Sequence, residues 1–571
     1  MGQKWKYQPP TYKQIEEADR LSEELDMSPI LCGLLVTRGI TTVAEAKQFF
    51  RPRLSNLHNP FLMNDMDIAV KRLNQALGRK ERILVYGDYD VDGTTAVALV
   101  YKFLQQFSSN IDYYIPDRKE DGYGISHRGV DYAHSTGVKL IIVLDCGIKA
   151  LDEIAYAKSL GIDFIVCDHH VPDEELPQAV AILNPKRADN TYPYQHLSGC
   201  GVGFKFMQAF AMDNGIPAEQ LYSLLDLVAV SIASDLVPIM GENRILAYHG
   251  LKQLNHGAST GLKAIIQVCG LRDKEININD IIFKIGPRIN ASGRIQQGKV
   301  AVDLLIENNL RTALAMSEQI NEFNETRKDL DKSMTEEANV IVENLENFDE
   351  KRAIVIFNED WHRGVIGIVA SRLTETYYRP TIVLTAGEDG IISGSARSVG
   401  GFDIYTAIDS CSDLLTNFGG HKYAAGLSMH INDLPEFKQR FEAYVAAHIQ
   451  PNQLQPTLDI EAELQLGDIT KQFYNVLRHL EPFGPGNPRP LFVSRRLINH
   501  RDTRAVGKER EHLRLDVTDR MNAITGIAFG RADMAEYIQN GNAVDICYEL
   551  NENTFNHYTT IQMMVQDIKP S

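Results

Sequence analysis

Between Arg82 and Pro185, four apolar runs of strand length alternate with helical patterns, and this arrangement constrains the fold most. The run RILVY precedes GDYDVDG, KLIIVL precedes Asp145, DFIVC precedes Asp168, and AVAILN precedes Pro185. Strands that alternate with helices form a parallel sheet covered by helices. Because residues beyond the carboxyl ends of such strands converge on one crevice, we expect these polar groups to meet although they are far apart in sequence.

The segment GDYDVDGTTA, residues 87–96, places aspartates at alternate positions directly after the first apolar run. In an extended chain alternate side chains share a face, so Asp90 and Asp92 aim at one point. Gly93 permits a sharp turn into a helix, which the spacing of apolar residues in TTAVALVYKFLQQF predicts. An acidic site is therefore expected at the start of this βα unit.

Further acidic and imidazole groups come from Asp145 in LDCG and from Asp168, His169 and His170 in CDHH. Asp235 is the last polar group of the apolar, helical DLVAVSIASDLVP, where a buried carboxylate needs a partner or a metal. A capping or turn role is the alternative for Asp235. Carboxylates mixed with imidazole favour Mn²⁺, with Mg²⁺ or Zn²⁺ as alternatives.

These ligands are too many for one ion, which predicts a two-metal phosphodiesterase site. Its residues are Asp90, Asp92, Asp145, His169, His170 and Asp235. Two divalent cations about 3.5 to 4 Å apart would activate a water and stabilise the leaving oxygen at phosphorus. Asp145 is assigned as the bridging ligand, because its strand end lies between the other two in sequence and, we expect, also in space.

The string DVDGTT after an apolar strand also fits the DxDGT signature of haloacid-dehalogenase-type phosphatases. In that alternative Asp90 is a covalent nucleophile and Asp92 the acid. It requires one Mg²⁺ and later strands that end in Ser or Thr, Lys and paired Asp. Here LDCG and CDHH follow instead, so the surroundings favour the two-metal site.

The whole chain of 571 residues is predicted to be an α/β multidomain protein. No Pro or Gly occurs from Lys299 to Phe348, which predicts long connecting helices, and short alternating strands such as HLRLDV and AITGIAF predict a C-terminal β-barrel. The expected segments are an N-terminal helical segment at 1–59, a catalytic parallel-sheet domain at 60–245, a helical connector at 246–348, a smaller α/β domain at 349–450 and the barrel at 451–571.

The charge, cysteine content and apolar runs of the sequence indicate which partners and which cellular compartment to expect. The net charge of −17, from 58 basic and 75 acidic residues, argues against a broad basic face, so a polyanion would need a local basic channel. The seven cysteines contain no CxxC pair, which predicts reduced core residues. No run of about 18 apolar residues and no secretory signal is found, so we expect a cytoplasmic protein that does not enter a membrane.

The triplet Asp168-His169-His170, with GDYDVDG and LDCG, resembles the DHH phosphoesterase superfamily. The further motifs GPRINASGRI, SGSARS, FGGHKYAAG and EPFGPGNPRP resemble its RecJ family of bacterial single-strand-specific exonucleases. The resemblance implies a DHH domain, a long connecting helix, a DHHA1 domain and an oligonucleotide-binding barrel around a central channel. It also implies processive 5′ to 3′ hydrolysis of single-stranded DNA to mononucleotides, in DNA repair and recombination.

The resemblance carries residue roles onto this sequence. It implies that Asp145 and His170 are catalytic, with His170 beside the scissile phosphate, and that the metal ligands are Asp90, Asp92, Asp145, His169 and Asp235. Asp88 matches the first acid of the family's motif, with orientation of a metal ligand as the alternative role, and Asp168 is a candidate for the same orienting role. The implied substrate contacts are a 5′-phosphate pocket of Arg118, Ser395 and Arg397, a narrow channel lined by Arg288, Asn290 and Arg294, and His421 at a nearby phosphate.

The implied cofactors are two divalent cations, Mn²⁺ or Mg²⁺, and the implied partners are single-stranded DNA, a single-strand-binding protein and a helicase. Candidates for tracking the strand on the barrel are Arg495, Arg496, Arg501 and Arg504. Shorter superfamily members that cleave oligonucleotides, cyclic dinucleotides or pyrophosphate are one alternative, which the length and the barrel disfavour. A catalytically inactive nucleic-acid-binding subunit is another, which the intact ligand set disfavours.

Overall fold

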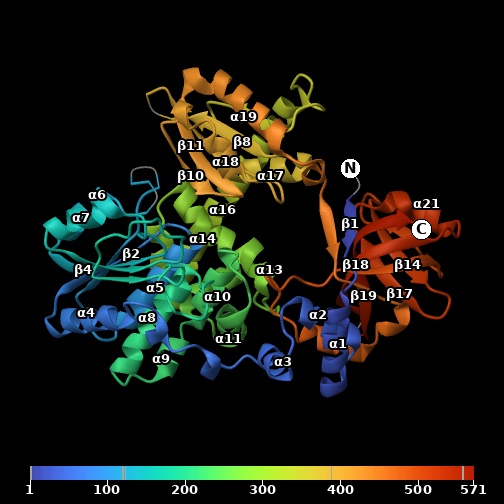
Figure 1. Ribbon diagram of the computed structural model, residues 1–571, viewed down its shortest axis with the longest axis horizontal. Coiled ribbons are helices and arrows are strands. Elements are labelled where there is room, and N and C mark those ends of the chain that lie inside the picture. The colour runs from blue at the N-terminus through green and yellow to red at the C-terminus, as the bar shows by residue number, and fades with distance from the viewer. Residues whose placement is uncertain (1–2, 119–120, 123, 388, 556–557) are drawn as a thin grey trace. The chain divides into compact units, whose positions relative to one another are not determined.

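The computed structural model describes residues 3–118, 121–122, 124–387, 389–555 and 558–571 (Figure 1). The chain forms two compact units. One contains Met1–Asn56, Pro238–Met240 and Pro456–Ser571, and the other contains Leu57–Val237 and Gly241–Gln455. The predicted α/β multidomain class is confirmed, while the finer segment boundaries stay predictions. Among the residues described, no helix is both long enough and apolar enough to span a bilayer.

The larger unit begins with a five-stranded parallel sheet in the order β3-β2-β4-β5-β6. Its strands are β2 (Arg82–Gly87), β3 (Ile111–Tyr114), β4 (Val138–Leu144), β5 (Asp163–Cys167) and β6 (Ala181–Leu183). Strand β4 is buried except at Lys139, as expected for a central parallel strand covered on both faces. The order places β4 between β2 and β5, so the position assigned to Asp145 in the sheet is confirmed.

Helices cover both faces of this sheet (Figure 1). Helices α5 (Val91–Leu104), α8 (Gly199–Asp213) and α10 (Leu225–Ser234) pack on one another. Helices α6 (His127–Ser135) and α7 (Leu151–Ser159) share a separate buried cluster with β2, β4 and β5. The remaining helices of this region are α4 (Met66–Gly78), α9 (Ala218–Tyr222) and α11 (Gly241–Gly257).

The predicted long connector consists of α15 (Lys299–Ile306) and α16 (Leu310–Glu343). The side chain of Asn309 accepts hydrogen bonds from two backbone N–H groups of the first turn and so caps α16. The π-helix η3 (Ile281–Ile285) leads into α14 (Gly286–Ile295), which packs against α16. Two shorter helices, α12 (Thr260–Val268) and α13 (Ile278–Asp280), come before them.

A second sheet, in the order β10-β11-β9-β8-β7, follows α16. Only β7 and β8 pair in parallel, and the other neighbours are antiparallel. The strands are β7 (Ile354–Phe357), β8 (Thr381–Ala386), β9 (Ile391–Arg397), β10 (Asn417–His421) and β11 (Ala424–His430), and the helices are α17 (Ile366–Tyr377), α18 (Ile404–Asp409) and α19 (Leu434–His448).

The smaller unit contains the predicted β-barrel. Seven strands run in the order β13-β14-β18-β19-β17-β16-β15, and an extra pairing of β14 with β16 closes the sheet. The strands are β13 (Ala462–Glu463), β14 (Phe492–Asn499), β15 (Arg504–Val506), β16 (His512–Thr518), β17 (Ala523–Ala528), β18 (Val544–Phe555) and β19 (Tyr558–Pro570), with helices α20 (Lys471–Arg478) and α21 (Ala535–Gln539).

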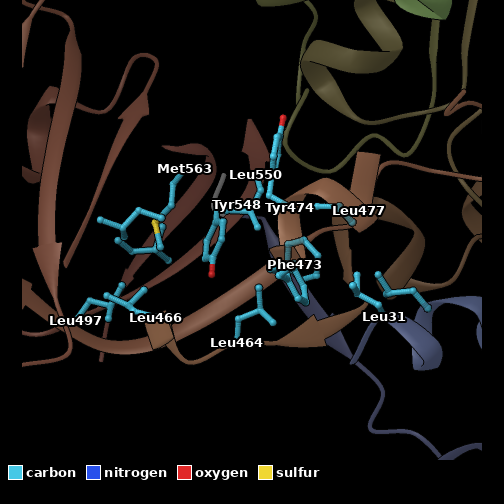
Figure 2. Close-up of a cluster of buried hydrophobic side chains, with 14 of the residues drawn as sticks. Leu31, Leu464, Leu466, Phe473, Tyr474, Leu477, Leu497, Tyr548, Leu550 and Met563 are labelled. Atoms are coloured by element: carbon cyan, nitrogen blue, oxygen red, sulfur yellow. The ribbon is translucent and has the colours of Figure 1, made fainter. Parts of the chain in front are cut away.

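The N-terminal segment packs on this barrel. Its helices α1 (Tyr12–Leu25), α2 (Pro29–Thr37) and α3 (Val43–Phe50) confirm the predicted helical content. Leu31 of α2 belongs to the barrel's buried cluster with Phe473 and Leu477 (Figure 2). Strand β1 (Lys4–Tyr7) was not predicted, and it pairs in parallel with β12 (Thr457–Ile460).

Candidate active site

The carboxyl ends of β2, β4 and β5, with the end of α10, bring the predicted acidic and imidazole side chains together. Their ligand atoms form three overlapping groups, and within each group the atoms lie within 4.8 Å of one another. The groups are Asp88, Asp90 and Asp145; Asp92, His169 and Asp235; and Asp145, His169 and His170. All six residues of the predicted two-metal site, and Asp88, are therefore in one place.

His169 lies at the centre of this cluster. Its Nε2 is 3.2 Å from Asp145 Oδ1, 3.5 Å from Asp235 Oδ2 and 3.8 Å from Asp92 Oδ2. Within the described residues, neither ring nitrogen of His169 has a hydrogen-bond partner. Burial lowers the pKa of His169, which favours the neutral ring that a metal binds.

Asp92 is fixed by the start of α8. Its Oδ2 accepts a hydrogen bond from Gly199 N at 2.6 Å, and its Oδ1 accepts from Cys200 N at 2.8 Å and from Ser231 Oγ at 2.6 Å. The free N–H groups at a helix N-terminus stabilise negative charge. The start of α8 and Ser231 of α10 therefore hold Asp92 in one orientation.

Two glycines permit this close packing. A Cβ added to Gly199 would lie 2.5 Å from Asp145 Cβ and 2.6 Å from its Oδ1, and one added to Gly93 would lie 2.4 Å from the carbonyl oxygen of Asp88. Asp145 itself adopts φ 60°, a left-handed backbone that non-glycine residues rarely use. Such strain is typical of functional positions.

The carboxylates repel one another. Burial, followed by the charges of neighbouring aspartates, raises the pKa of Asp88, Asp90 and Asp145, and raises that of Asp235 to about 9. Asp88 Oδ1 and Asp235 Oδ2 are also buried without a hydrogen-bond partner in the described part of the chain. These unpaired carboxylate oxygens, together with the unpaired ring nitrogens of His169, fit a divalent cation that binds both oxygen and nitrogen ligands.

Asp168 is placed differently from the other acids. Its Oδ1 accepts hydrogen bonds from the backbone N–H groups of His169 and His170 and lies 2.7 Å from His170 Nδ1, and its Oδ2 accepts from Ile148 N. Although burial opposes ionisation, these interactions lower the pKa of Asp168 to about 2. For His170, burial favours a lower pKa, but the hydrogen bond to Asp168 and the charges of Asp168, Asp92 and Asp90 outweigh it. The pKa of His170 is therefore raised.

A cluster of arginines lies in the same unit. Arg397 Nη1 donates to Ser395 Oγ at 2.9 Å, and Arg294 Nη1 donates to Gly364 O at 2.9 Å. Burial, with the charges of Arg118, Arg397 and Arg327, lowers the pKa of Arg294 to about 10. The structure therefore brings the predicted residues Arg118, Ser395, Arg397 and Arg294 together.

The remaining predicted substrate contacts are His421 and two residues of α14, Arg288 and Asn290. Burial, followed by the charges of Arg397 and His170, lowers the pKa of His421, so this histidine lies within electrostatic range of both residues. Arg288 donates to Asn321 Oδ1 and to Lys284 O, and Asn290 is half-buried on α14. Arg288 is thus held by neighbouring helices.

Two residues of these clusters were missed from the sequence. Tyr89 lies under the Arg118 guanidinium, and Arg327 of α16 approaches Arg294. The only signal for Tyr89 was its place inside GDYDVDG, and Arg327 lies in a charged helical pattern without a motif.

On the barrel, the predicted strand-tracking residues Arg495 and Arg504 already pair with acidic side chains.

Three protein-family models match this chain. Residues 82–232 match the DHH family, N-terminal domain; residues 339–447 match the DHHA1 domain; and residues 460–567 match the RecJ OB domain. A parallel sheet with this cluster of aspartates and histidines at its strand ends, followed by these two domains, defines a hydrolase of the DHH class.

Two curated relatives show which family of this class the chain belongs to. The chain is 35% identical to the single-stranded-DNA-specific exonuclease RecJ of Bacillus subtilis, over 99% of this chain and 70% of the relative, and 34% identical to the protein of that name from Salmonella typhimurium, over 97% and 98%. The chain belongs to the RecJ family.

Solved structures of RecJ are similar to this chain over its whole length. RecJ from Thermus thermophilus in complex with Mn²⁺ matches with a TM-score of 0.85 and 27% identity, over 100% of this chain and 80% of that one. The same protein has been solved with Mg²⁺.

Proposed function

We propose that this protein is a single-stranded-DNA-specific exonuclease that degrades strands from the 5′ end to mononucleotides and acts in DNA repair and recombination. The observation that carries the proposal is the set of three overlapping ligand groups at the strand ends, beside a cluster of arginines. The proposed protein partners are a helicase, which exposes single strands, and a single-strand-binding protein, which coats them.

Two divalent cations, Mn²⁺ or Mg²⁺, are the proposed cofactors. Asp90, Asp92, Asp145, His169 and Asp235 would hold them, and Asp145 belongs to two of the three ligand groups, which supports its assignment as the bridging residue. When bound, the cations supply an activated water and stabilise charge at the phosphorus.

His170 is the proposed contact to the scissile phosphate. Asp168 lies 2.7 Å from its Nδ1 and so orients the ring, and the side chain is 44% exposed, which allows contact with a substrate. The raised pKa of His170 favours the protonated ring. An imidazolium can donate a hydrogen bond to a phosphate oxygen whose negative charge increases in the transition state.

The arginine cluster supports a 5′ to 3′ direction. A terminal phosphate carries about two negative charges at neutral pH, whereas an internal phosphodiester carries one. Arg118 and Arg397 with Ser395 offer forked donors that suit such a group. A terminal phosphate bound there would place the next phosphodiester at the metal ligands, so that one nucleotide is removed per cut.

A cleavage assay tests the proposal. Single strands labelled at either end, with a 5′-phosphate or a 5′-hydroxyl, are supplied with Mn²⁺ beside a matching duplex and a small phosphomonoester. We expect progressive release of mononucleotides from the 5′ end of single strands only. Hydrolysis of the phosphomonoester alone would support the dehalogenase-type alternative and refute the nuclease.

A further inference from the structure

Tyr89 lies between the two clusters of the proposed active site. It stands between Asp88 and Asp90, which both belong to one ligand group. The Cζ atom of Arg118 lies 5.3 Å from the centroid of the Tyr89 ring, within the range of a cation–π contact. One half-buried side chain therefore connects the metal-ligand loop with a proposed 5′-phosphate contact.

The backbone of Tyr89 is held from the side of α14. A Cβ added to Gly293 would lie 2.9 Å from Tyr89 O. One added to Gly298 would lie 3.0 Å from Tyr89 Cβ and 2.7 Å from Ile115 Cγ2. Because both positions are glycines, the start of α15, the end of α14 and the segment leading from Ile115 to Arg118 all approach Tyr89 closely.

We propose that Tyr89 is a positioning residue that sets the place of the Arg118 guanidinium relative to the metal ligands, and so sets the selectivity for a 5′-phosphorylated end. This inference rests on the proposed function. The arginine side chain has several freely rotating bonds, and Arg118 lies in the segment between β3 and α6. The Tyr89 ring limits those rotations and keeps the guanidinium on one side of the ligand loop.

The measured quantity is the ratio of kcat/KM for a single strand with a 5′-phosphate to that for the same strand with a 5′-hydroxyl. In Tyr89→Leu we expect this ratio to fall by about 3- to 30-fold, the range that a cation–π contact supplies. Tyr89→Phe keeps the ring and should retain the wild-type ratio. Tyr89→Met is measured in parallel, so that a folding defect of one variant does not decide the outcome.

Phe348→Leu is the matched control. It removes a comparable contact, that of Arg379 with the Phe348 ring at 4.1 Å, which belongs to neither cluster. The ratio should remain at the wild-type value. Mn²⁺ affinity is measured for all variants, and an unchanged affinity in Tyr89→Leu shows that Asp88 and Asp90 keep their places.

A double-mutant cycle with Arg118→Gln separates positioning from a general structural effect. If Tyr89 acts through Arg118, Tyr89→Leu changes the ratio little once Arg118 is already Gln. An equal effect in both backgrounds, or a loss in Tyr89→Phe as large as in Tyr89→Leu, would overturn the inference. Wild-type protein that cleaves single strands without preferring a 5′-phosphate would also overturn it but leave the nuclease standing. Wild-type protein that does not cleave single strands would refute both.

Discussion

The helix-start residue Gly199 lies directly against the strand-end residue Asp145: a Cβ at Gly199 would lie 2.6 Å from Asp145 Oδ1. Gly199→Ala should therefore displace the carboxylate assigned as the bridging ligand. It should also disturb the hydrogen bond from Gly199 N to Asp92. We expect Mn²⁺ affinity and nuclease activity to fall by about 10- to 100-fold, the size typical for altered support of metal ligands.

Gly201→Ala provides the comparison, because it lies in the same helix and its nearest added contact is 3.3 Å, to Ser198 Oγ. It should keep both properties near the wild-type level. Calorimetric titration with Mn²⁺ and single-turnover cleavage measure the two effects. Equal behaviour of the two alanine variants would refute the role given to Gly199.

The pH dependence of the metal-free protein follows from the raised carboxylate pKa values. Asp235 has a pKa of about 9 in the folded protein against 3.8 ordinarily, because of burial and the charges of Asp92 and Asp90. The folded state thus holds protons that the unfolded state releases. The stabilising contribution of Asp235 is complete below 3.8, its pKa in the unfolded chain, and is lost as the pH rises through about 9, its pKa in the folded protein.

Metal-free Tm should accordingly decrease from about pH 5 to pH 9. The rise in Tm on adding Mn²⁺ should grow over the same interval, because metal binding requires deprotonated ligands. Asp235→Asn should flatten both curves. A wild-type metal-free Tm that climbs steadily across this interval would show that another group dominates.

Arg397 should contribute to binding a terminal phosphate. Its Nη1 is already aligned by Ser395 Oγ and Ala396 O. Arg397→Gln should raise KM for a 5′-phosphorylated strand by about 10- to 100-fold, since a hydrogen bond to a charged group contributes about 1.5 to 3 kcal/mol. KM for the 5′-hydroxyl strand should change little.

Arg440→Gln is the control for lost positive charge, because Arg440 of α19 forms a partly exposed ion pair with Asp413 in the same domain. It should leave both KM values unchanged. Steady-state kinetics on the two strands decide between the outcomes. A similar loss on both strands in Arg397→Gln would indicate a general electrostatic effect and not a terminal-phosphate contact.

The metal-ligand cluster could be predicted because strand-end geometry is a local rule. The ends of three apolar runs bring Asp90, Asp145 and His169 to one edge of the sheet. The expectation that Asp92 shares a face of an extended chain with Asp90 is wrong, because Asp92 lies in the first turn of α5. The neighbours of these residues could not be predicted in the same way. Whether Tyr89 meets Arg118 depends on how loops of different strands pack, and no sequence period encodes that.

The pairing of β1 with β12 shows the same limit at a larger scale. Lys4 faces Thr457 and Tyr7 faces Ile460 in a parallel ladder between distant parts of the chain. Lys4–Tyr7 alternates charged and aromatic residues, but four residues are too few to show which distant strand they pair with. Tertiary packing brings the two strands together, since Trp5 and Tyr7 pack with Leu458 against buried Val493 of the barrel.

Arg38 should anchor that N-terminal segment to the barrel. It donates to both Glu461 carboxylate oxygens, at 2.6 and 3.1 Å, and to Asn487 Oδ1 and Pro488 O, and its side chain is only 4% exposed. Removing one partner of a buried ion pair leaves the other charge uncompensated. Arg38→Met should therefore lower the free energy of unfolding of the smaller unit by about 3 kcal/mol.

Tryptophan fluorescence can follow this unit alone, because the two tryptophans of the chain, Trp5 and Trp361, lie in different units. In a Trp361→Phe background, urea unfolding reported by Trp5 should shift to a lower midpoint in Arg38→Met. Arg20→Met is the control, since Arg20 makes an exposed hydrogen bond to Thr41 O, and its cost should stay within about 0.5 kcal/mol. The double variant Arg38→Met/Glu461→Met should recover much of the loss, because no uncompensated charge remains. A midpoint for Arg38→Met equal to that of Arg20→Met would show that Arg38 does not hold the N-terminal segment on the barrel.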